Sequence, residues 1–454
     1  MRPGPAAARA AAAALKRSAA LKRLAPHRLD PAVVAAWRMF RQRLDAPMFR
    51  APEDIAGGLA RTGWLVSPSG STPYLSLAAR YPGFTRADLD RAVFLDGTLL
   101  ELPTFRDLTV VVPIEDAWLA LQGNSSRSRQ RLDDFIRRRG LVRLADLRNL
   151  QDVVRAVLAG RPLSAETLAQ KVPYRLVKDL GDAGRRAGLP TSLDLAVRDL
   201  VSSGDVVYLK TERRLDRKRG EYSLRLDLRG PAVTADVRPR PEEEYSTALA
   251  ERYFRWLGPA RLTDFAWWAD LPLDRARQAA RSVGLLPVEP AGLKGEWFLP
   301  EVLMEGMQNY RPPEPAAVAF VPFQDMLTSA WKTFEGMLDP HDLKRPLVGW
   351  TGKPVPAREA GPAGTHHHFI VIGGRVAGAW EHGPDGVLRY ATFSGLAPEL
   401  EKLLAQRATG LAEFVVRELG EARFYSGAEG PAGNLAAVAD GWGGRSSAVS
   451  PRGH

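Results

Sequence analysis

Residues 258–284 read GPARLTDFAWWADLPLDRARQAARSVG, and this stretch decides the fold expected for the chain. The pattern predicts two short helices, the first capped by Thr263 and the second ended by a glycine. Consecutive helical residues point about 100° apart, so Trp267 and Trp268 cannot lie on one face. Phe265 and Trp268 are three residues apart and share a face. We therefore expect one tryptophan to pack beneath the second helix and the other to face a neighbouring domain, with a base-stacking wedge as the less favoured alternative.

The elements on either side of this stretch complete a winged-helix order. A helix is expected over residues 244–258, and LLPVEPAGLKGEWFLP predicts two short strands after the quoted residues. An earlier region repeats the order: helices over residues 163–172 and 193–204 precede DVVYLKTERRLDRKRGEYSLRL, which predicts two strands around a charged tip. The repeat is one of element order, not of sequence period, and a third copy within residues 30–120 is left open.

The last third of the chain predicts a different architecture. HHHFIVIGGRVAGAWEHGPDGVLRYATF reads as three strands joined by two glycine turns, which is a β-meander. The predicted fold class is therefore α+β, with tandem winged-helix (helix-turn-helix) modules followed by a C-terminal β-rich domain. The expected divisions are a basic, Ala-rich, disordered arm (1–29), an N-terminal helical or winged-helix-like module (30–122), a winged-helix module with a basic wing (123–232), a second winged-helix module with the Trp-Trp helix (240–310), the β-rich domain with a final helix (311–425) and a disordered tail (426–454).

Composition limits the classes of protein that fit. The 454 residues contain no cysteine, which excludes disulfides, thiolate catalysis and cysteine-held metal sites and suits a reducing cytoplasm. The formal net charge of +11 favours a polyanionic partner, nucleic acid before an anionic membrane surface. No run approaches the ~18 apolar residues that a membrane span requires. We expect a monomer that binds double-stranded DNA, has no membrane partner and is associated with the nucleoid in the cytoplasm.

Two basic segments are candidates for contact with DNA. The tip RRLDRKR (213–219) and the segment GNSSRSRQR (123–131) both suit phosphate oxygens, because arginine and serine are good donors to them. The alternatives are a solvated turn for the tip and a basic interdomain linker for the second segment. The candidate DNA contacts are Arg127, Arg129, Arg213, Arg214, Arg217, Lys218 and Arg219.

Metal and cofactor motifs are weak. In a strand His366 and His368 would share a face, but two ligands are too few for zinc and no H-E-x-x-H pattern occurs. A polar strand edge is the favoured interpretation of the three histidines. The glycine-rich segments do not lie between a strand and a helix of a βαβ unit, and no Walker A motif is present. The sequence therefore predicts no metal and no cofactor.

Several segments together resemble one family. The quoted Trp-Trp stretch is accompanied by QRL (42–44), ARYPGFTRADLDRAV (79–93), FVPFQDMLTSAW (320–331) and VIGGRVAGAWE (371–381). They resemble the bacterial winged-helix DNA-binding family that contains the AlkZ/YcaQ-type DNA glycosylases, over most of residues 30–415. The resemblance implies tandem winged helices with a β-rich domain. It also implies an enzyme in which a Q-x-Q or Q-x-D motif positions the hydrolytic water, so that alkylated bases are removed or crosslinked ones unhooked.

The chain departs from that family pattern at the catalytic positions. Residues 63–77 (GWLVSPSGSTPYLSL) contain no Gln, Asp or Glu, and the motif positions fall near Val66–Ser69. Serine hydroxyls can bind a water, but an unassisted serine is a poor base at neutral pH. Many relatives have R-G-T-x-H at a second position, where this chain keeps the arginine and lacks the histidine. Asp107 is the nearby carboxylate that could replace the missing group, unless it is a turn aspartate paired with Arg106 or with a helix end. The candidate catalytic residues are Asp107, Ser67, Ser69 and Arg106.

Two functions are therefore carried forward. The first is a DNA glycosylase acting in repair of alkylated or crosslinked bases. The alternative is a non-catalytic DNA-binding protein on the same scaffold, a regulator or a lesion recogniser, which the missing Q-x-Q motif favours. RNA binding has no RRM or KH signature behind it.

Overall fold

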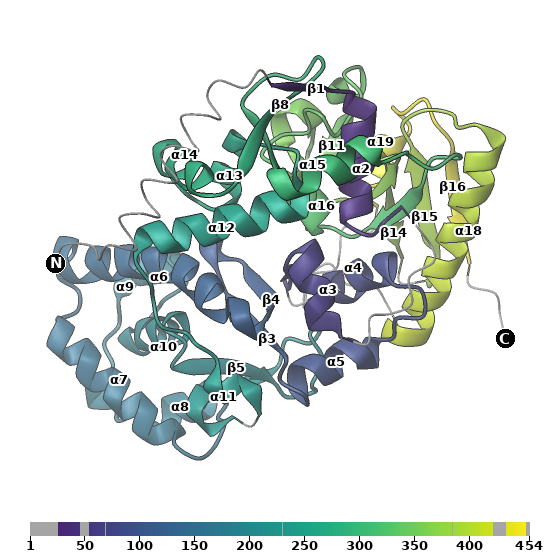
Figure 1. Ribbon diagram of the computed structural model, residues 1–454. Helices are drawn as coiled ribbons and strands as arrows, with labels where there is room; N and C mark the ends of the chain where they lie inside the picture. The colour runs from purple at the N-terminus through teal and green to yellow at the C-terminus, as the bar shows by residue number, and fades with distance from the viewer. Residues whose placement is uncertain are drawn as a thin grey trace.

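The computed structural model describes residues 26–45, 54–68, 70–228, 230–383, 385–420 and 433–450; the side chains of Ser126, Arg127 and Ala232 lie outside this description. Figure 1 shows a lower left lobe of blue and teal helices beside a larger body that contains the N-terminal helices, the green helices and the C-terminal sheet. The mixture of helices and strands agrees with the α+β class. Within the described ranges, no helix combines the length and the hydropathy needed to cross a bilayer.

Two of the N-terminal helices begin at side-chain caps. Asp30 Oδ1 accepts a hydrogen bond from Ala32 N at 2.7 Å, and Thr85 forms a capping box with Asp88. Both caps satisfy amide groups that have no partner inside the helix. The helices are α2 (Pro31–Arg41), α3 (Ile55–Thr62), α4 (Thr72–Arg80) and α5 (Arg86–Phe94).

A small antiparallel sheet follows these helices. It contains β2 (Leu65–Val66), β3 (Leu99–Pro103) and β4 (Thr109–Pro113), in the order β2-β4-β3. A 3₁₀ turn (Phe105–Asp107) joins β3 to β4. The sheet therefore carries three of the candidate catalytic residues. Ser67 follows β2, and Arg106 and Asp107 lie in the β3–β4 turn.

The basic segment 123–131 lies inside a long helix, α6 (Ala117–Asp133), which continues as a π-helical turn (Asp134–Arg138). The segment is therefore neither a loop nor a linker, and its contact with phosphate stays a prediction. Tertiary packing overrides the weak helix propensity of this Gly/Ser/Asn run: Asn124 Nδ2 donates to Ser202 Oγ at 3.0 Å, and a Cβ on Gly123 would lie 2.8 Å from the Phe105 ring.

The lower lobe is a helical module closed by a hairpin. Leu163 exchanges both backbone hydrogen bonds with Tyr222, at 2.9 and 2.8 Å, and so adds a third extended segment to the hairpin. The module has its own apolar core, separate from the two cores of the larger body. Its elements are α7 (Leu144–Leu158), α8 (Ala165–Lys171), α9 (Gly181–Arg186), α10 (Ser192–Ser202), β5 (Val206–Lys210), β6 (Gly220–Leu224) and the short α11 (Pro231–Thr234).

The tip of this hairpin docks against the larger body instead of standing in solvent. Leu215 is fully buried in a core cluster with residues of α4, α5 and the C-terminal sheet, and its amide donates to Tyr74 Oη at 2.7 Å. Arg214 is held by Asp216, which is 1% exposed, at 2.6 Å. The alternative of a wholly solvated turn is therefore wrong, because one leucine within the charged run anchors it. Phosphate contact by the exposed cations of the tip stays a prediction.

Removing the Tyr74 hydroxyl tests this docking. The hydroxyl donates to Asp90 Oδ1 at 2.5 Å as well as accepting from the Leu215 amide, so Tyr74→Phe leaves two buried groups unsatisfied. We expect the free energy of unfolding in urea to fall by about 1–3 kcal/mol. Tyr208→Phe is the control, because its hydroxyl bonds the exposed Lys218 carbonyl. Equal stability of the two variants would contradict the docking contact.

The Trp-Trp stretch forms the centre of the larger body. Trp268 is 5% exposed, and its ring lies 4.9 Å from the Phe105 ring and 5.9 Å from the Trp64 ring, so the core placement predicted for one tryptophan is confirmed. Trp267 is partly exposed and carries the Arg106 guanidinium, 3.7 Å from its ring centroid. The elements are α12 (Glu242–Leu257), β7 (Ala260–Arg261), α13 (Leu262–Trp268), α14 (Leu273–Ser282), β8 (Leu285–Pro290), β9 (Trp297–Pro300) and α15 (Glu301–Asn309).

The predicted β-meander is present in a five-stranded antiparallel sheet of order β10-β13-β14-β15-β16. Helix α18 (Pro398–Phe414) packs along β10, and Figure 1 shows it in yellow-green at the right edge of the molecule. The strands are β10 (Val318–Val321), β13 (His368–Ile372), β14 (Arg375–His382), β15 (Leu388–Thr392) and β16 (Ser446–Val449), accompanied by β11 (Pro346–Val348), β12 (Pro354–Pro356), α16 (Met326–Ser329), α17 (Ala357–Ala360) and α19 (Ala436–Ala439).

Short described parts of both terminal segments form strands where their composition predicted disorder. β1 (His27–Leu29), at the end of the expected disordered arm, pairs in parallel with β8. Within the expected disordered tail, β16 pairs with β15, and Trp442 is buried with its ring 4.7 Å from the Phe393 ring. Pairing with an open sheet edge and burial of one aromatic ring stabilise these segments, whose small residues bury little apolar surface of their own. Residues 1–25, 421–432 and 451–454 lie outside the described part.

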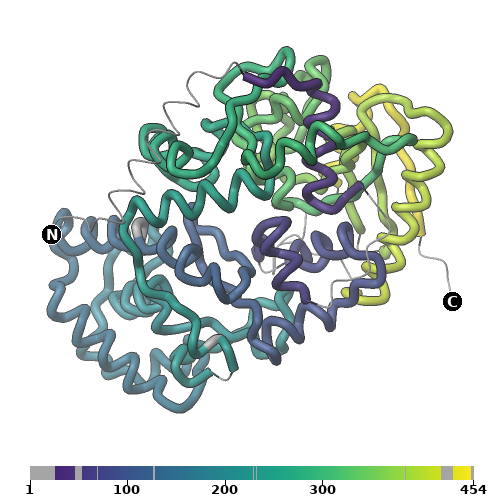
Figure 2. Tube along the Cα trace, in the orientation of Figure 1, coloured from purple at the N-terminus to yellow at the C-terminus, as the bar shows by residue number. Residues whose placement is uncertain are grey.

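Segments distant in sequence meet around one buried arginine. Arg80 makes two hydrogen bonds to Asp325, at 2.7 and 2.8 Å, and a third to Gln42 Oε1 at 2.9 Å. Gln42 in turn donates to the carbonyls of Thr62 and Trp256. Figure 2 shows the purple N-terminal helix lying among green segments from the second half of the chain. Three of the segments that carry the family resemblance therefore share one hydrogen-bond network.

Candidate active site

The β3–β4 turn has a strained backbone. Arg106 and Asp107 have φ values of +59° and +57°, a left-handed conformation that costs roughly 1–2 kcal/mol for each residue that is not glycine. Two contacts hold the turn: Thr104 N donates to Leu108 O at 2.8 Å, and the Arg106 guanidinium lies on the Trp267 ring. Backbone strain at two adjacent residues that are not glycine is typical of a turn with a function. The Trp-Trp stretch thus fixes the fold with one ring and supports this turn with the other.

The turn places the Asp107 carboxylate at the rim of a cavity. Asp107 is 47% exposed, and Arg131 from α6 donates to its Oδ1. Both residues line a cavity of about 880 Å³ that separates the β3–β4 turn from the lower lobe. Arg131 also borders an adjoining hollow of about 700 Å³ beside α9. Arg131 is not among the residues predicted from the sequence, although it lies one helical turn after the predicted Arg127.

The cavity combines apolar walls with a few polar groups. A binding site of this composition encloses a flat, mostly apolar molecule and orients it by its polar edge. The walls come from α8, α10 and the segments beside them, and two tyrosines of the hairpin form one side. The apolar lining includes Leu168, Val177, Leu189, Leu193, Val197 and Val201; the polar lining includes Asp107, Thr109, Asn124, Arg131, Asp194 and Arg198; the aromatic lining is Tyr174, Tyr208 and Tyr222.

Ser67 does not face this cavity. Ser67 is 1% exposed, and its hydroxyl donates to Glu101 Oε1 at 2.6 Å. Its backbone is close to the turn, since Ser67 N donates to Thr109 O at 2.8 Å. The structure therefore brings Ser67, Arg106 and Asp107 to one end of one sheet, but of these three only Asp107 lines the cavity. Ser69 lies outside the described residues.

The group that meets Ser67 was missed from the sequence. The Glu101 carboxylate is 9% exposed and lies 3.9 Å from Lys210 Nζ on β5. Burial raises the pKa of Glu101, partly offset by Lys210 and by the Ser67 hydroxyl. The signal was a lone acid in the apolar strand LLELP, where alternation alone predicts nothing charged. This buried pair joins the lower lobe to the sheet that carries the turn.

The predicted DNA-contacting residues divide into three groups. Arg129 on α6 and Arg213, Lys218 and Arg219 at the hairpin tip are exposed. Arg217 lies 3.3 Å from Glu212, and Arg214 is paired with Asp216 as described, so these two are engaged within the tip. Arg127 is a residue of α6 whose side chain lies outside the description.

Two of the three histidines have structural roles. His367 Nε2 accepts from Val348 N at 2.8 Å, and His368 Nδ1 accepts from Phe323 N at 2.7 Å. Burial lowers the pKa of His367 to about 3, so it stays neutral as an acceptor. Elsewhere in the described part, Asp339, His341 and Asp342 lie close enough together to hold a cation, but Arg375 and Arg345 already pair with the two carboxylates.

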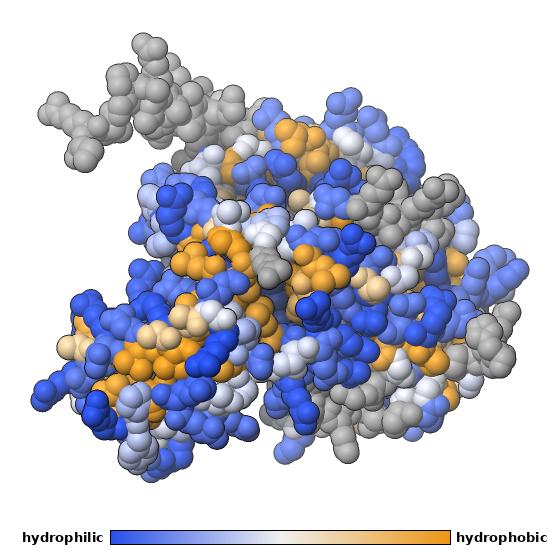
Figure 3. Space-filling model, turned by 90° about the horizontal axis from the view of Figure 1, so that it is seen from below, coloured by the Kyte–Doolittle hydropathy of each residue, from blue (hydrophilic) through white to orange (hydrophobic). Residues whose placement is uncertain are grey.

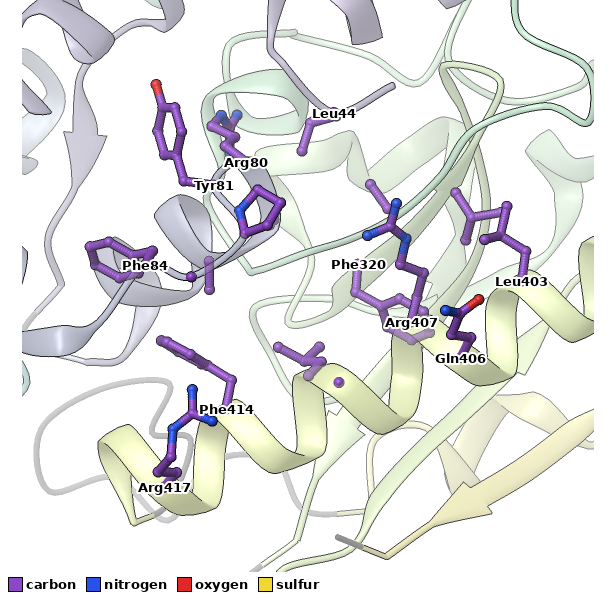
Figure 4. A pocket seen from close by; sticks show the side chains of 18 residues that line it. Leu44, Arg80, Tyr81, Phe84, Phe320, Leu403, Gln406, Arg407, Phe414 and Arg417 are labelled. Atoms are coloured by element: carbon purple, nitrogen blue, oxygen red, sulfur yellow. The ribbon is translucent and has the colours of Figure 1, made fainter. Parts of the chain in front are cut away.

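A further cavity, of about 430 Å³, lies between α4 and α18 (Figure 4). Arg407 of α18 and Arg417 of the π-helical turn that follows it (Val415–Leu419) line this cavity, and the remaining lining is mostly apolar, with Phe84 and Phe414 beside each other. Among the residues that the structure describes, its lining contains no carboxylate and none of the candidate catalytic residues. It therefore offers no group suited to activating a water.

The surface agrees with a cavity set between two parts of the molecule. Seen from below, hydrophilic side chains cover most of both parts, while apolar side chains gather on the left-hand lobe and beside the hollow that separates it from the rest (Figure 3). A strained turn carrying an exposed carboxylate beside such a cavity defines a candidate hydrolytic site.

Comparison with known proteins identifies the family. The fold is similar to that of the Streptomyces sahachiroi DNA glycosylase AlkZ, with 19% sequence identity and a TM-score of 0.63 over 88% of this chain and 99% of that one. No curated protein is detectably similar in sequence. The model of the DNA glycosylase AlkZ-like family matches residues 59–414. The chain belongs to this family.

Proposed function

We propose that this protein is a DNA glycosylase that binds duplex DNA and hydrolyses the N-glycosidic bond of a modified base. One observation carries the proposal: the strained β3–β4 turn holds the Asp107 carboxylate at the mouth of the 880 Å³ cavity. Family membership supports the same activity. The expected substrates are alkylated or crosslinked bases.

In this proposal the target nucleotide leaves the base stack and its base enters the cavity. The cavity walls exclude water from the base, and the polar groups of the rim orient it. Asp107 accepts a proton from a water that attacks C1′ as the glycosidic bond breaks, and the departing base takes the bonding electrons. The carboxylate also stabilises the positive charge that develops on the sugar. Arg106, held on Trp267, fixes the turn that aims this carboxylate.

The winged-helix divisions expected from the sequence remain part of the proposal. Helices α7, α8 and α10, the extended residue Leu163 and the β5–β6 hairpin follow the winged-helix order. Helices α12 to α14 with β7 to β9 follow it again. In the first module the third helix is mostly buried, and Leu193 and Val197 on it line the cavity. DNA contacts are therefore assigned to exposed cations at the cavity rim and hairpin tip.

The test is incubation of the purified full-length chain with duplex DNA carrying an alkylated base or a crosslink. The expected product is an abasic site, revealed by strand cleavage after alkali. Tight binding without abasic product would reject catalysis and favour the non-catalytic DNA binder. That alternative has one specific observation behind it: Ser67, at the family's motif position, is buried against Glu101 and cannot hold a water beside the substrate.

The exposed tip cations predict a change in the salt dependence of binding. Replacing Arg213, Lys218 and Arg219 by alanine should weaken binding to all duplex sequences alike. It should also flatten the slope of log affinity against log salt by roughly 2.7, because each phosphate contact contributes about 0.9. Replacing the exposed Arg28, Lys353 and Lys402 is the matched control for net charge. An unchanged slope in the tip variant, measured by fluorescence anisotropy, would remove the tip from the DNA interface.

A further inference from the structure

Tyr174 is the most exposed of the large hydrophobic side chains in the described part of the chain, with 90% of its surface accessible. A single exposed apolar residue is ordinary on a protein surface. The position of Tyr174 is not ordinary, because it borders the cavity that Asp107 also borders. A ring this exposed contributes little to the stability of the folded protein, so stability does not explain its position at the cavity rim.

The backbone beneath Tyr174 is rigid. Val177 N donates to Tyr174 O at 3.0 Å and closes a 3₁₀ turn, while Pro173 restricts the chain just before it. Lys178, which follows this turn, is hydrogen-bonded to the start of α10: Lys178 N donates to Ser192 Oγ at 2.9 Å, and Ser192 N donates to Lys178 O at 2.8 Å. The ring therefore projects from a fixed point, which lowers the entropy that its ordering on a ligand would cost.

The surroundings of Tyr174 suit a nucleic-acid strand. Lys171 and Arg175 are exposed on either side of it in the sequence. Inside the cavity, the rings of Tyr208 and Tyr222 lie 5.2 Å apart and supply aromatic surface to whatever enters. Tyr174 projects outward from the rim, so its ring is available to the DNA that stays outside. An aromatic ring between two cations matches a base step between two phosphates.

We infer that Tyr174 is the wedge that enters the duplex and fills the space left by the extruded nucleotide. This inference rests on the proposed function. The ring stacks on the base next to the vacated position, and Lys171 and Arg175 bind the flanking phosphates. Tyr174 is a positioning residue: it touches neither the water nor the glycosidic bond, and it acts by keeping the target nucleotide out of the stack.

The experiment uses the full-length chain and a duplex that contains a tetrahydrofuran abasic analogue next to 2-aminopurine. The analogue leaves a gap in the stack, and 2-aminopurine fluorescence reports stacking beside that gap. We expect the wild-type chain and Tyr174→Phe to quench the fluorescence, because both supply a ring. Tyr174→Ala should bind without quenching and should lose about 5- to 100-fold in affinity for this duplex relative to an undamaged one. Leu226→Ala, which truncates a side chain that is 71% exposed, is the control.

The outcomes separate this inference from the function on which it rests. If the wild-type chain bound no DNA, the proposed function itself would be wrong. If the wild-type chain bound and excised bases while Tyr174→Ala quenched as the wild type does, only the wedge would be rejected. Because the side chain is so exposed, Tyr174→Ala should keep the wild-type melting temperature, and a lower value would mean that its effects arise from misfolding.

Discussion

Replacing Asp107 by asparagine is expected to lower the single-turnover rate of base excision by about 10²- to 10⁴-fold, the range typical of a lost general base. Asparagine keeps the size of the side chain and its tolerance of a left-handed backbone, so the strained turn should persist. Duplex affinity should stay within about threefold of wild type, because only one charge at the rim has changed. The rate is measured with enzyme in excess over lesion-containing DNA, so that product release does not limit it.

The matched control for this variant is Asp385→Asn. Asp385 is 48% exposed and ion-paired with Arg389, much as Asp107 is 47% exposed and paired with Arg131, but it lies in a turn of the C-terminal sheet. Its replacement should leave excision unchanged. Wild-type excision by Asp107→Asn would show that the water is activated by another group, and the buried Glu101 would then be the next carboxylate to replace.

The sequence predicted the β3–β4 turn as the candidate site but not the residues that surround it. The missing glutamines and the retained arginine were visible along the chain, and they led directly to Arg106 and Asp107. The partners of these residues could not be found in the same way, because Arg131 and Trp267 come from helices distant in sequence. Ser67 was selected for its position in the motif, yet its burial depends on Glu101, which lies 34 residues further along.

The same limit applies to the fold. Local signals such as the caps at Asp30 and Thr85 and the core face of Trp268 were sufficient, because neighbours in sequence decide them. The docked hairpin tip was missed because six charges in RRLDRKR outweighed the single Leu215 in any estimate of polarity. The ordered ends were missed for a related reason: a strand that completes an existing sheet edge needs little hydrophobicity of its own.

Replacing Arg80 by methionine is expected to reduce the free energy of unfolding by about 3–5 kcal/mol, the cost of leaving a buried charge without its partner. Arg80 and Asp325 are 2% and 1% exposed, so solvent cannot replace the lost guanidinium. Asp325 also caps α16 by accepting from Leu327 N at 2.9 Å, and Gln42 would lose a donor. Arg91→Met is the control: its ion pair with Asp96 is 70% and 45% exposed and should cost under about 1 kcal/mol.

A double variant separates the value of the ion pair from the cost of breaking it. Combining Arg80→Met with Asp325→Leu removes both charges, and apolar replacements of a buried pair are often neutral or stabilising. The double variant should therefore be more stable than Arg80→Met alone, although Asp325→Leu also removes the α16 cap. If the double variant were no more stable, the network would be stabilised mainly by its hydrogen bonds to Gln42 and the backbone, and not by the pairing of charges. Urea denaturation of Arg80→Met, Arg91→Met and the double variant, followed by tryptophan fluorescence, distinguishes these outcomes.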